Sequence, residues 1–275
     1  MNVKINIRKY NGCGNDFVIL PFYEALDYSQ LAQQLCNRFD TDGLIAVKET
    51  LSEESLEMIF YNRDGSRAPM CGNGIRCFAQ YVRDLGIISA QTVKFPVKTL
   101  AGVMKVEILH EAPCLVRVDM GTARIADGST KMAVKDSGHH RLDIAGLTVD
   151  IYTLFMGTIH TVVFVDNAAD MLNSGLGEQI CNYPLFLEKT NVNFVQLIDR
   201  ENLSVRTFER GVGWTLACGT GCCASAVIAQ KLQLADNTLH VHLDRGELLI
   251  ENRENEIFMT GSSEFEFESE VIVND

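Results

Sequence analysis

The chain has 275 residues, 47% of them hydrophobic, and a formal net charge of −12 at pH 7. This length and composition predict a soluble globular protein with one large domain or two ordinary ones. The acidic balance and the lack of any Lys/Arg-rich run argue against a nucleic-acid-binding surface, and no apolar stretch approaches the roughly 18 residues of a membrane span.

The cysteines indicate the cellular compartment that the protein is suited to. The chain has nine cysteines, an odd number, and residues 1–10 lack the apolar core of a signal peptide. We therefore expect cytosolic thiols rather than a disulfide framework. Zinc is the alternative, because Cys218 and Cys222 have the spacing of a zinc knuckle. Cys71 and Cys77 lie too far apart for such a site, however, and no histidine lies close in sequence to either pair, so we expect no metal.

The first half is predicted to contain strands, one early helix, and a cysteine loop that leads into a helix-like run. The strands are expected over residues 4–8, 17–20, 44–49, 57–61, 93–97, 102–109 and 115–119. The early helix is expected over residues 29–39, with Ser29 as its N-cap. The loop Cys71-Gly72-Asn73-Gly74 then precedes an apolar-periodic run over residues 78–85.

A turn-rich segment over residues 121–147 is the expected joint, and the second half then repeats the first. It is predicted to contain the loop 157–160, a helix-like piece at 168–176, a cysteine loop starting at Cys218 and a helical run over 224–234. Its strands are expected over residues 151–156, 161–165, 192–197, 204–208, 240–243, 247–251, 256–260 and 264–273.

The spacing of the matching loops indicates an internal duplication. Asn15 precedes Cys71 by 56 residues, and His160 precedes Cys218 by 58. Two similar domains would place equivalent loops across one cleft. We expect one domain to comprise residues 1–119 with 264–275, and the other residues 120–263.

Each cysteine loop places a thiol and several unpaired backbone N–H groups at the start of a helix. Such a terminus binds anions and lowers the pKa of a thiol. We hypothesise that Cys71 and Cys218 lie on opposite sides of one amino-acid carbon. Inverting that carbon requires one group that removes the α-proton and another that returns a proton to the opposite face. The alternative is that both loops are ordinary helix starts with buried, inert cysteines.

Further polar groups are candidates for substrate binding. The amides of Gly72, Asn73, Gly219 and Thr220 are expected to hold the carboxylate and to stabilise the charge that develops on it. At matching strand ends lie Asn62 in the first half and Glu209 with Arg210 in the second. These groups could hold an α-ammonium and a second, remote carboxylate, which arginine binds through two hydrogen bonds. The alternative for Glu209 and Arg210 is that they form an ordinary ion pair on the surface and bind no substrate.

Taken together, these motifs resemble diaminopimelate epimerase, a two-cysteine amino-acid epimerase that uses no pyridoxal phosphate. The resemblance covers nearly the whole chain, and its segments occur in the family's order. They are GCGNDFV at 12–18, NRDGS at 62–66, MCGNGIRC at 70–77, TNVNFV at 190–195, ERGVG at 209–213 and ACGTG at 217–221.

The resemblance implies an α+β fold of two pseudo-symmetric β-rich domains, each a mixed sheet or barrel wrapped around a central helix. It implies Cys71 and Cys218 as the base and acid, with no cofactor, in a cytoplasmic homodimer that converts LL-diaminopimelate to the meso isomer for lysine and cell-wall synthesis. The implied substrate contacts are Asn15, Asn62, Gly72, Asn73, Thr158, Asn191, Glu209, Arg210, Gly219 and Thr220.

Three departures from the family pattern concern the substrate. Thr158-Ile159 stands where the family has Asn-Pro, so an asparagine that helps to hold the remote end of the substrate is replaced by threonine. The loop at residues 39–43 is shortened, and Trp214 stands where a glutamate is common. A racemase of another amino acid, such as histidine, is therefore the alternative. A binding protein without catalysis and a thiol redox sensor using Cys71 and Cys218 are the remaining readings.

Overall fold

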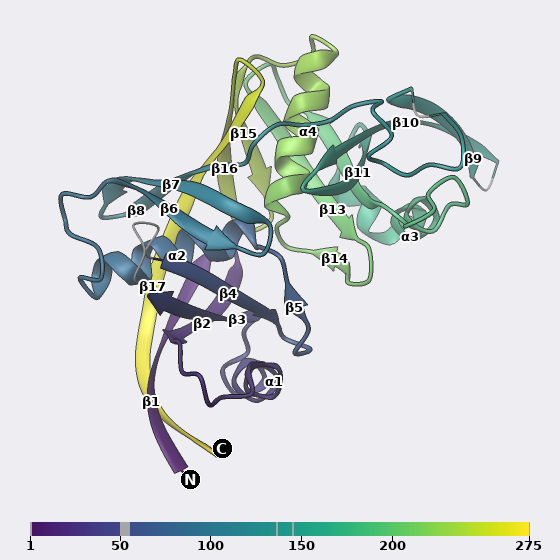
Figure 1. Ribbon diagram of the computed structural model, residues 1–275. Coiled ribbons are helices and arrows are strands. Elements are labelled where there is room, and N and C mark those ends of the chain that lie inside the picture. The colour runs from purple at the N-terminus through teal and green to yellow at the C-terminus, as the bar shows by residue number, and fades with distance from the viewer. Residues whose placement is uncertain (1, 50–55, 136, 145, 275) are drawn as a thin grey trace. The chain divides into compact units, whose positions relative to one another are not determined.

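The computed structural model describes residues 2–49, 56–135, 137–144 and 146–274. The chain divides into two compact units, which we call unit 1 (Met1–Asp119 with Thr260–Asp275) and unit 2 (Met120–Met259). Both consist mainly of strands, with one long helix enclosed by strands in each (Figure 1). The α+β class with two β-rich halves is therefore confirmed.

The strands of unit 1 form a closed ring. Hydrogen bonds link them in the order β1, β2, β3, β4, β6, β7, β8, β17 and back to β1. β2 and β3 are parallel, as are β4 and β6. The bounds are β1 (Asn2–Gly12), β2 (Asn15–Pro21), β3 (Gly43–Glu49), β4 (Leu56–Asn62), β5 (Arg67–Ala68), β6 (Lys94–Thr99), β7 (Gly102–Glu111), β8 (Cys114–Asp119) and β17 (Glu256–Asn274).

Two helices pack on opposite faces of this ring. Helix α1 (Tyr28–Phe39) connects the parallel strands β2 and β3 and packs on their outer face, whereas α2 (Gly72–Asp84) contacts β1, β2, β3, β7 and β8 from within. Successive strand side chains point to opposite faces, so strands covered on both sides must be apolar throughout. The sequences Phe17–Leu20 and Leu44–Val47 meet that requirement and are fully buried.

Unit 2 repeats this order of elements. The parallel strands β11 and β12 are connected by the short helices η1 (Ala169–Asn173) and α3 (Leu176–Cys181), and β13 then returns antiparallel to β12. The bounds of the strands are β9 (His139–Ile144), β10 (Leu147–Met156), β11 (Thr158–Phe164), β12 (Asn191–Leu197), β13 (Asn202–Glu209), β14 (Gly213–Thr215), β15 (Thr238–Leu243) and β16 (Gly246–Arg253).

Helix α4 (Gly219–Lys231) is the counterpart of α2, and it contacts β10, β11, β12, β13, β15 and β16. Its side chains at Ala224, Ser225, Ala226 and Ala229 are small and fully buried. A helix enclosed on all sides needs an apolar or small residue at nearly every position, which explains why this segment shows no strong polar face. The segment that begins at Met120 completes the strands around α4. The backbone of Met120 bonds to that of Ile257, and the backbone of Arg124 bonds to that of Phe155 in β10.

Several details differ from the sequence expectations. The N-cap of α1 is Asp27, whose carboxylate accepts from the amides of Ser29 and Gln30, so the expected Ser29 cap is wrong. Instead, the Ser29 hydroxyl donates to the carbonyl of Gly65. Both enclosed helices begin directly after their cysteines, earlier than the apolar periodicity indicated, because glycine and asparagine in the first turn carry no hydrophobic signal.

The second half differs at three further places. The expected loop at 157–160 is a tight turn at Gly157, which has a φ of 69°, and β11 already begins at Thr158. The expected helix at 168–176 is split at Gly175, which also has positive φ, into η1 and α3. The turn-rich segment 121–147 contains β9, which pairs with β10.

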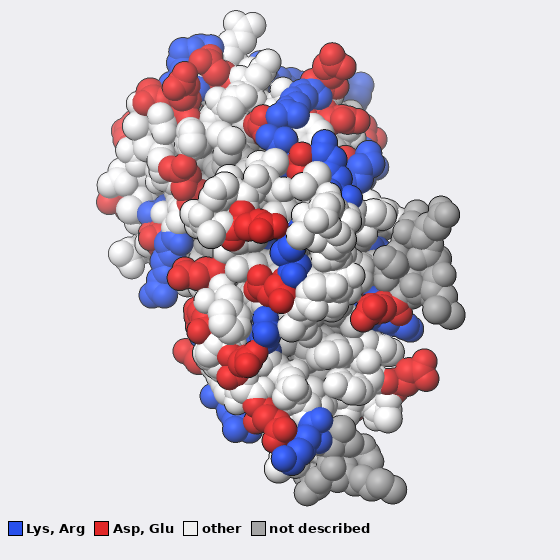
Figure 2. Space-filling model, turned by 90° about the vertical axis from the view of Figure 1, so that its left-hand side faces the viewer, with Lys and Arg blue, Asp and Glu red and all other residues white. Residues whose placement is uncertain are grey.

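Charged side chains of both signs are scattered over the face of the molecule that Figure 2 shows. Lys and Arg side chains lie interspersed with Asp and Glu there. Within the ranges that the structure describes, no helix combines the length and the apolar character needed to cross a bilayer.

The reassigned helix cap can be tested directly. Asp27→Ala should lower the free energy of unfolding by about 1 kcal/mol, because two amides of the first turn of α1 lose their acceptor. Asp27→Asn should retain most of the stability, since its side-chain oxygen still accepts. Urea denaturation followed by circular dichroism would measure both, and equal stability of Asp27→Ala and the wild type would contradict the cap.

Candidate active site

Both enclosed helices begin at a cysteine. Cys71 is the N-cap of α2 in an extended conformation, and its sulfur accepts from the Gly74 amide at 3.4 Å. Cys218 is the N-cap of α4 in a similar conformation, with its Sγ 3.6 Å from the Thr220 hydroxyl. The thiol of Cys71 is half-buried and that of Cys218 is buried. Each cysteine therefore lies among the unpaired amides of a helix N-terminus.

Around α2, the strand ends bring Asn15 and Asn73 together. Asn15 begins β2, and its Oδ1 accepts from Nδ2 of Asn73 at 2.6 Å. The Asn15 amide also donates to Asp42, just before β3. Asn62 lies at the end of β4, opposite Gly43, and donates to the Ser66 hydroxyl within its own turn.

Around α4, the corresponding strand ends bring together Asn191, Glu209 and Arg210. Asn191 begins β12, and its Oδ1 accepts from the Arg210 backbone amide at 3.0 Å. The Arg210 guanidinium donates to the Glu188 carbonyl. Glu209 ends β13, and its carboxylate accepts from the Thr215 hydroxyl at 2.8 Å.

The Glu209 carboxylate also contacts the Cys218 thiol. Burial raises the pKa of Glu209, and this rise is opposed by hydrogen bonds from Thr215 and Cys218. Burial, and after it the Glu209 charge, raises the pKa of Cys218 well above its ordinary value, against a hydrogen bond from Thr220. A low-dielectric site disfavours an anion next to another anion. Cys218 is therefore held in its protonated form in this unit.

His160 is a site residue that the sequence did not single out for a role. It is fully buried on β11, opposite Asn191. Burial and the Arg210 charge lower its pKa to about 3, so the imidazole is neutral. The Asn193 amide donates to the Thr161 carbonyl and to Nδ1 of His160, which places the imidazole proton on Nε2. The available sequence signal was its position in the second half, 58 residues before Cys218, where Asn15 lies 56 residues before Cys71 in the first half.

Three buried polar atoms in these two clusters have no hydrogen-bond partner among the described residues. They are Oδ1 of Asn73, Oγ1 of Thr158 and Nε2 of His160. Thr158 begins β11 directly after Gly157, and a Cβ on Gly157 would lie 3.5 Å from the Thr220 methyl at the start of α4. Buried polar groups in folded proteins are nearly always paired, so these three atoms are candidates for contacts with a ligand.

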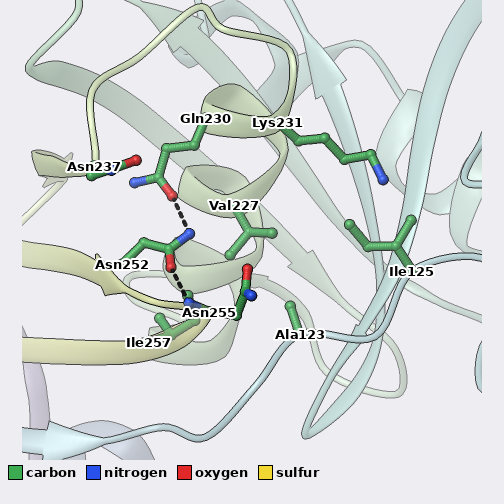
Figure 3. Close-up of a pocket in the computed structure, with 9 residues that line it drawn as sticks. All are labelled: Ala123, Ile125, Val227, Gln230, Lys231, Asn237, Asn252, Asn255 and Ile257. Atoms are coloured by element: carbon green, nitrogen blue, oxygen red, sulfur yellow. Dashed lines mark hydrogen bonds between the residues drawn. The ribbon is translucent and has the colours of Figure 1, made fainter.

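A pocket of about 380 Å³ in unit 2 lies elsewhere (Figure 3). Gln230 and Lys231 line it from the last turn of α4, whereas Cys218 caps the first turn of the same helix. Its amides bond to one another, with Asn252 donating to Gln230 and accepting from the Asn255 backbone. This pocket is therefore separate from the cysteine cluster. Among the described residues, no group of three or more His, Cys, Asp or Glu side chains is arranged to hold a metal ion.

Gly221 shows how tightly the α4 cluster is packed. A Cβ at this position would lie 2.3 Å from Oδ1 of Asn193, which is held by the Thr207 hydroxyl. At the matching position of α2, a Cβ on Gly74 would lie 3.1 Å from the tip of Ile45, 3.3 Å from that of Met58 and 3.3 Å from the Cys71 Cβ, none closer than 3.0 Å. A fixed amide cannot move aside, whereas the ends of flexible side chains can.

Substituting the two glycines should therefore give unequal results. Gly221→Ala should destabilise the protein by about 2 kcal/mol more than Gly74→Ala, because overpacking against a hydrogen-bonded amide costs more than the helix propensity of alanine returns. Thermal and urea unfolding of both variants would measure the difference. Equal stabilities would contradict the described packing of Asn193.

Comparisons with known proteins show what this chain is similar to. The family model of diaminopimelate epimerase matches residues 7–126 and 152–266. The diaminopimelate epimerase of Caldanaerobacter subterraneus subsp. tengcongensis is 41% identical over 96% of this chain and 98% of its own length. That of Halothermothrix orenii is 37% identical over 99% of this chain and 100% of its own.

Solved structures share the fold at low sequence identity. A phenazine biosynthesis protein of the PhzF family from Bacillus anthracis has a TM-score of 0.70 at 15% identity and covers 98% of this chain and 100% of its own. A hydroxyproline epimerase from Agrobacterium vitis, with bound trans-4-hydroxy-L-proline, has a TM-score of 0.69 at 10% identity, with coverages of 99% and 93%. The family model and the sequence relatives, which extend over nearly the whole chain, show that this protein is an isomerase of the diaminopimelate epimerase family.

Proposed function

We propose that the protein epimerises LL-diaminopimelate to the meso isomer without a cofactor, by proton transfer between Cys71 and Cys218. The carrying observation is that each duplicated half has a cysteine as the N-cap of its enclosed helix, next to buried polar atoms without partners. Family membership supports the substrate, because the relatives matched over nearly the whole chain are diaminopimelate epimerases.

The chemistry needs a base on one face of the α-carbon and an acid on the other. One thiolate takes the α-proton and becomes a thiol, while the opposite thiol donates its proton and becomes a thiolate, so the reaction balances without any further reactant. Negative charge develops on the carboxylate between these steps. The amides of Gly72, Asn73, Gly219 and Thr220 belong to helix first turns and are suited to stabilise it.

The buried polar atoms suit the ends of such a substrate. Oδ1 of Asn73 can only accept and therefore matches an ammonium, as does the Glu209 carboxylate. The hydroxyl of Thr158 and Nε2–H of His160 can donate to a carboxylate, next to the Arg210 charge. Asn15, Asn62 and Asn191 stay in the proposal as contacts carried by the family resemblance.

The two sulfurs are proposed to start in different protonation states. Cys218 is buried beside Glu209, which favours the thiol. Cys71 is half-buried and accepts an amide hydrogen bond at the N-terminus of α2, which favours the thiolate. The substrate isomer that presents its α-proton to Cys71 is then ready to react without a prior proton shift.

A racemase of another amino acid, histidine included, is the second candidate. Thr158 favours it, because its side chain is shorter than the asparagine common in the family and leaves more room at the remote end of the substrate. Chiral chromatography of a panel of L- and D-amino acids with the three diaminopimelate isomers would decide between the two.

We further propose a cytoplasmic homodimer, whose oligomeric state sedimentation would test. The epimerase domains are proposed to comprise residues 1–119 plus 264–275 and residues 120–263.

Removing either sulfur tests the two-base chemistry. Cys71→Ala and Cys218→Ala should each lower epimerisation by about 10³-fold, since each removes one of the two proton-transfer groups. In D₂O, each variant should still exchange the α-proton of the isomer that faces its remaining cysteine. Cys36→Ala, a buried cysteine of α1, is the control and should keep its activity. Full epimerisation by either single variant would contradict the proposal, as would a wild type that binds diaminopimelate but exchanges no α-proton.

The role of Glu209 predicts a shift in the pH profile. When Cys218 is the proton donor, kcat/KM falls as pH rises through the pKa of this thiol. Glu209→Gln removes the negative charge that raises this pKa, so the fall should move to lower pH by about one unit. Thr215→Val keeps the carboxylate and should leave the fall near its wild-type position. A shift of Glu209→Gln to higher pH would contradict the assignment.

A further inference from the structure

Arg76 is a fully buried arginine in unit 1, and the proposed reaction gives it no role. It follows Cys71 by five residues on α2 and is 0% exposed. Among the fully buried side chains of the described residues it is the largest. Its guanidinium donates from Nη1 to the Gly72 carbonyl at 3.0 Å and from Nε to the Ser262 carbonyl at 3.2 Å. An arginine stays protonated under all ordinary conditions, so a permanent positive charge lies inside the ring.

The direction of the side chain places this charge at the start of the helix. Helical side chains tilt toward the N-terminus, and the bond to Gly72 shows that Arg76 folds back onto the residue directly after Cys71. A Cβ on Gly12 would lie 3.6 Å from Nη2 of Arg76 and 3.1 Å from the carbonyl of Asn73, so β1 covers the same turn. The charge therefore adds to the positive end of the helix dipole.

The duplicated half lacks this charge at the matching place. The residue five positions after Cys218 is Cys223, which is buried and neutral in its thiol form. Conversely, the residue nine positions before Cys218 is the acid Glu209, whereas Asn62 occupies that place before Cys71. Two halves with the same backbone plan thus carry opposite charges beside their cysteines. The Glu209 charge raises the pKa of the Cys218 thiol, and a positive charge beside a thiol acts in the opposite direction.

The Arg76 charge already acts on a neighbouring thiol. Burial raises the pKa of Cys77 to about 12, and a hydrogen bond with Ser263 and the charge of Arg76 both oppose that rise. Other ionisable groups on elements packed against α2 include Cys13 and charged residues joined in ion pairs. The pairs are Lys9 with Asp16 and Glu266, Arg8 with Glu268, Arg117 with Glu107, and Lys105 with Asp119.

We propose that Arg76 is a positioning residue that keeps the Cys71 sulfur in its anionic form and so decides which of the two cysteines is the base in the resting enzyme. This inference rests on the proposed two-cysteine reaction. Arg76 acts through the helix N-terminus without touching the substrate. The guanidinium bonds to the carbonyl of Gly72, the residue next to Cys71, and neighbouring opposite charges in a poorly solvated site favour each other's ionised forms.

A purely structural role is the competing explanation, and α2 itself supplies the control. Arg83, in the last turn of α2, also donates to two backbone carbonyls, of Ser89 and Thr92. Its side chain is 10% exposed. Arg83→Met therefore removes a comparable carbonyl-bound guanidinium from the same helix, but at the end remote from Cys71. Loss of packing alone would affect both variants alike.

The test measures alkylation of Cys71 by iodoacetamide between pH 6 and pH 10, with the modified peptide quantified by mass spectrometry. The thiolate is the reactive form, and the other eight cysteines are buried. In Arg76→Met and Arg76→Gln, the midpoint of the rate profile should rise by about one pH unit or more, and the rate below the midpoint should fall about tenfold. Arg76→Lys should restore most of the wild-type profile, and Arg83→Met should leave it unchanged.

The outcomes separate the inference from the function on which it rests. An unchanged midpoint in either folded neutral variant, or an equal shift in Arg83→Met, would overturn the role of Arg76. If Arg76→Met does not fold, Arg76→Gln and Arg76→Lys carry the comparison, because they differ in charge at similar length. Alkylation of Cys71 requires no catalytic turnover. If the wild type exchanged no α-proton, the proposed reaction would be wrong, but the alkylation profiles would still test the effect of Arg76 on Cys71.

Discussion

The unpaired backbone amides at the first turns of α2 and α4 are the constraint on which the rest of the structure depends. Four amides at each helix start have no partner within the helix, and a helix enclosed by strands cannot rely on water to satisfy them. A cysteine as the N-cap offers a sulfur, which accepts the Gly74 amide in unit 1. The remaining amides stay directed outward from the helix end and are suited to bind an anion.

The strand plan determines which side chains surround each helix start. In both units, two parallel strands separated by a helical connection are followed by an antiparallel strand, so two strand starts and one strand end lie at the same edge. In unit 2 these are the positions of Thr158, Asn191 and Glu209. The same plan in unit 1 gives Asn15, Gly43 and Asn62. Polar residues at this edge find partners near the helix starts, since Asn15 accepts from Asn73 and Asn191 accepts from the Arg210 backbone amide.

Duplication of the backbone did not duplicate the electrostatics. Unit 2 combines a half-buried carboxylate with a buried thiol and a neutral imidazole, whereas unit 1 combines a buried guanidinium with a half-buried thiol. In the proposed two-cysteine reaction, this difference prepares one sulfur to take a proton and the other to give one. The two units share the backbone plan, and they differ in the charged side chains near the cysteines, Arg76 in unit 1 and Glu209 in unit 2.

Local sequence determined a large part of this protein. Glycine-rich cysteine loops before helical runs, the repeated order of strands and the family motifs identified the fold class and the two helix starts, since capping and periodicity depend on neighbours in the chain. Even so, α1 is capped by Asp27 and not by Ser29 as expected, and Gly175 divides a segment that was expected to be one helix. Only the tertiary structure decided that Asn73 meets Asn15 across 58 residues, that Glu209 lies against Cys218, and that Arg76 bonds to Ser262 across 186 residues. Burial and the pairing of polar groups depend on segments far apart in the chain, so the local sequence alone does not show which groups surround each thiol.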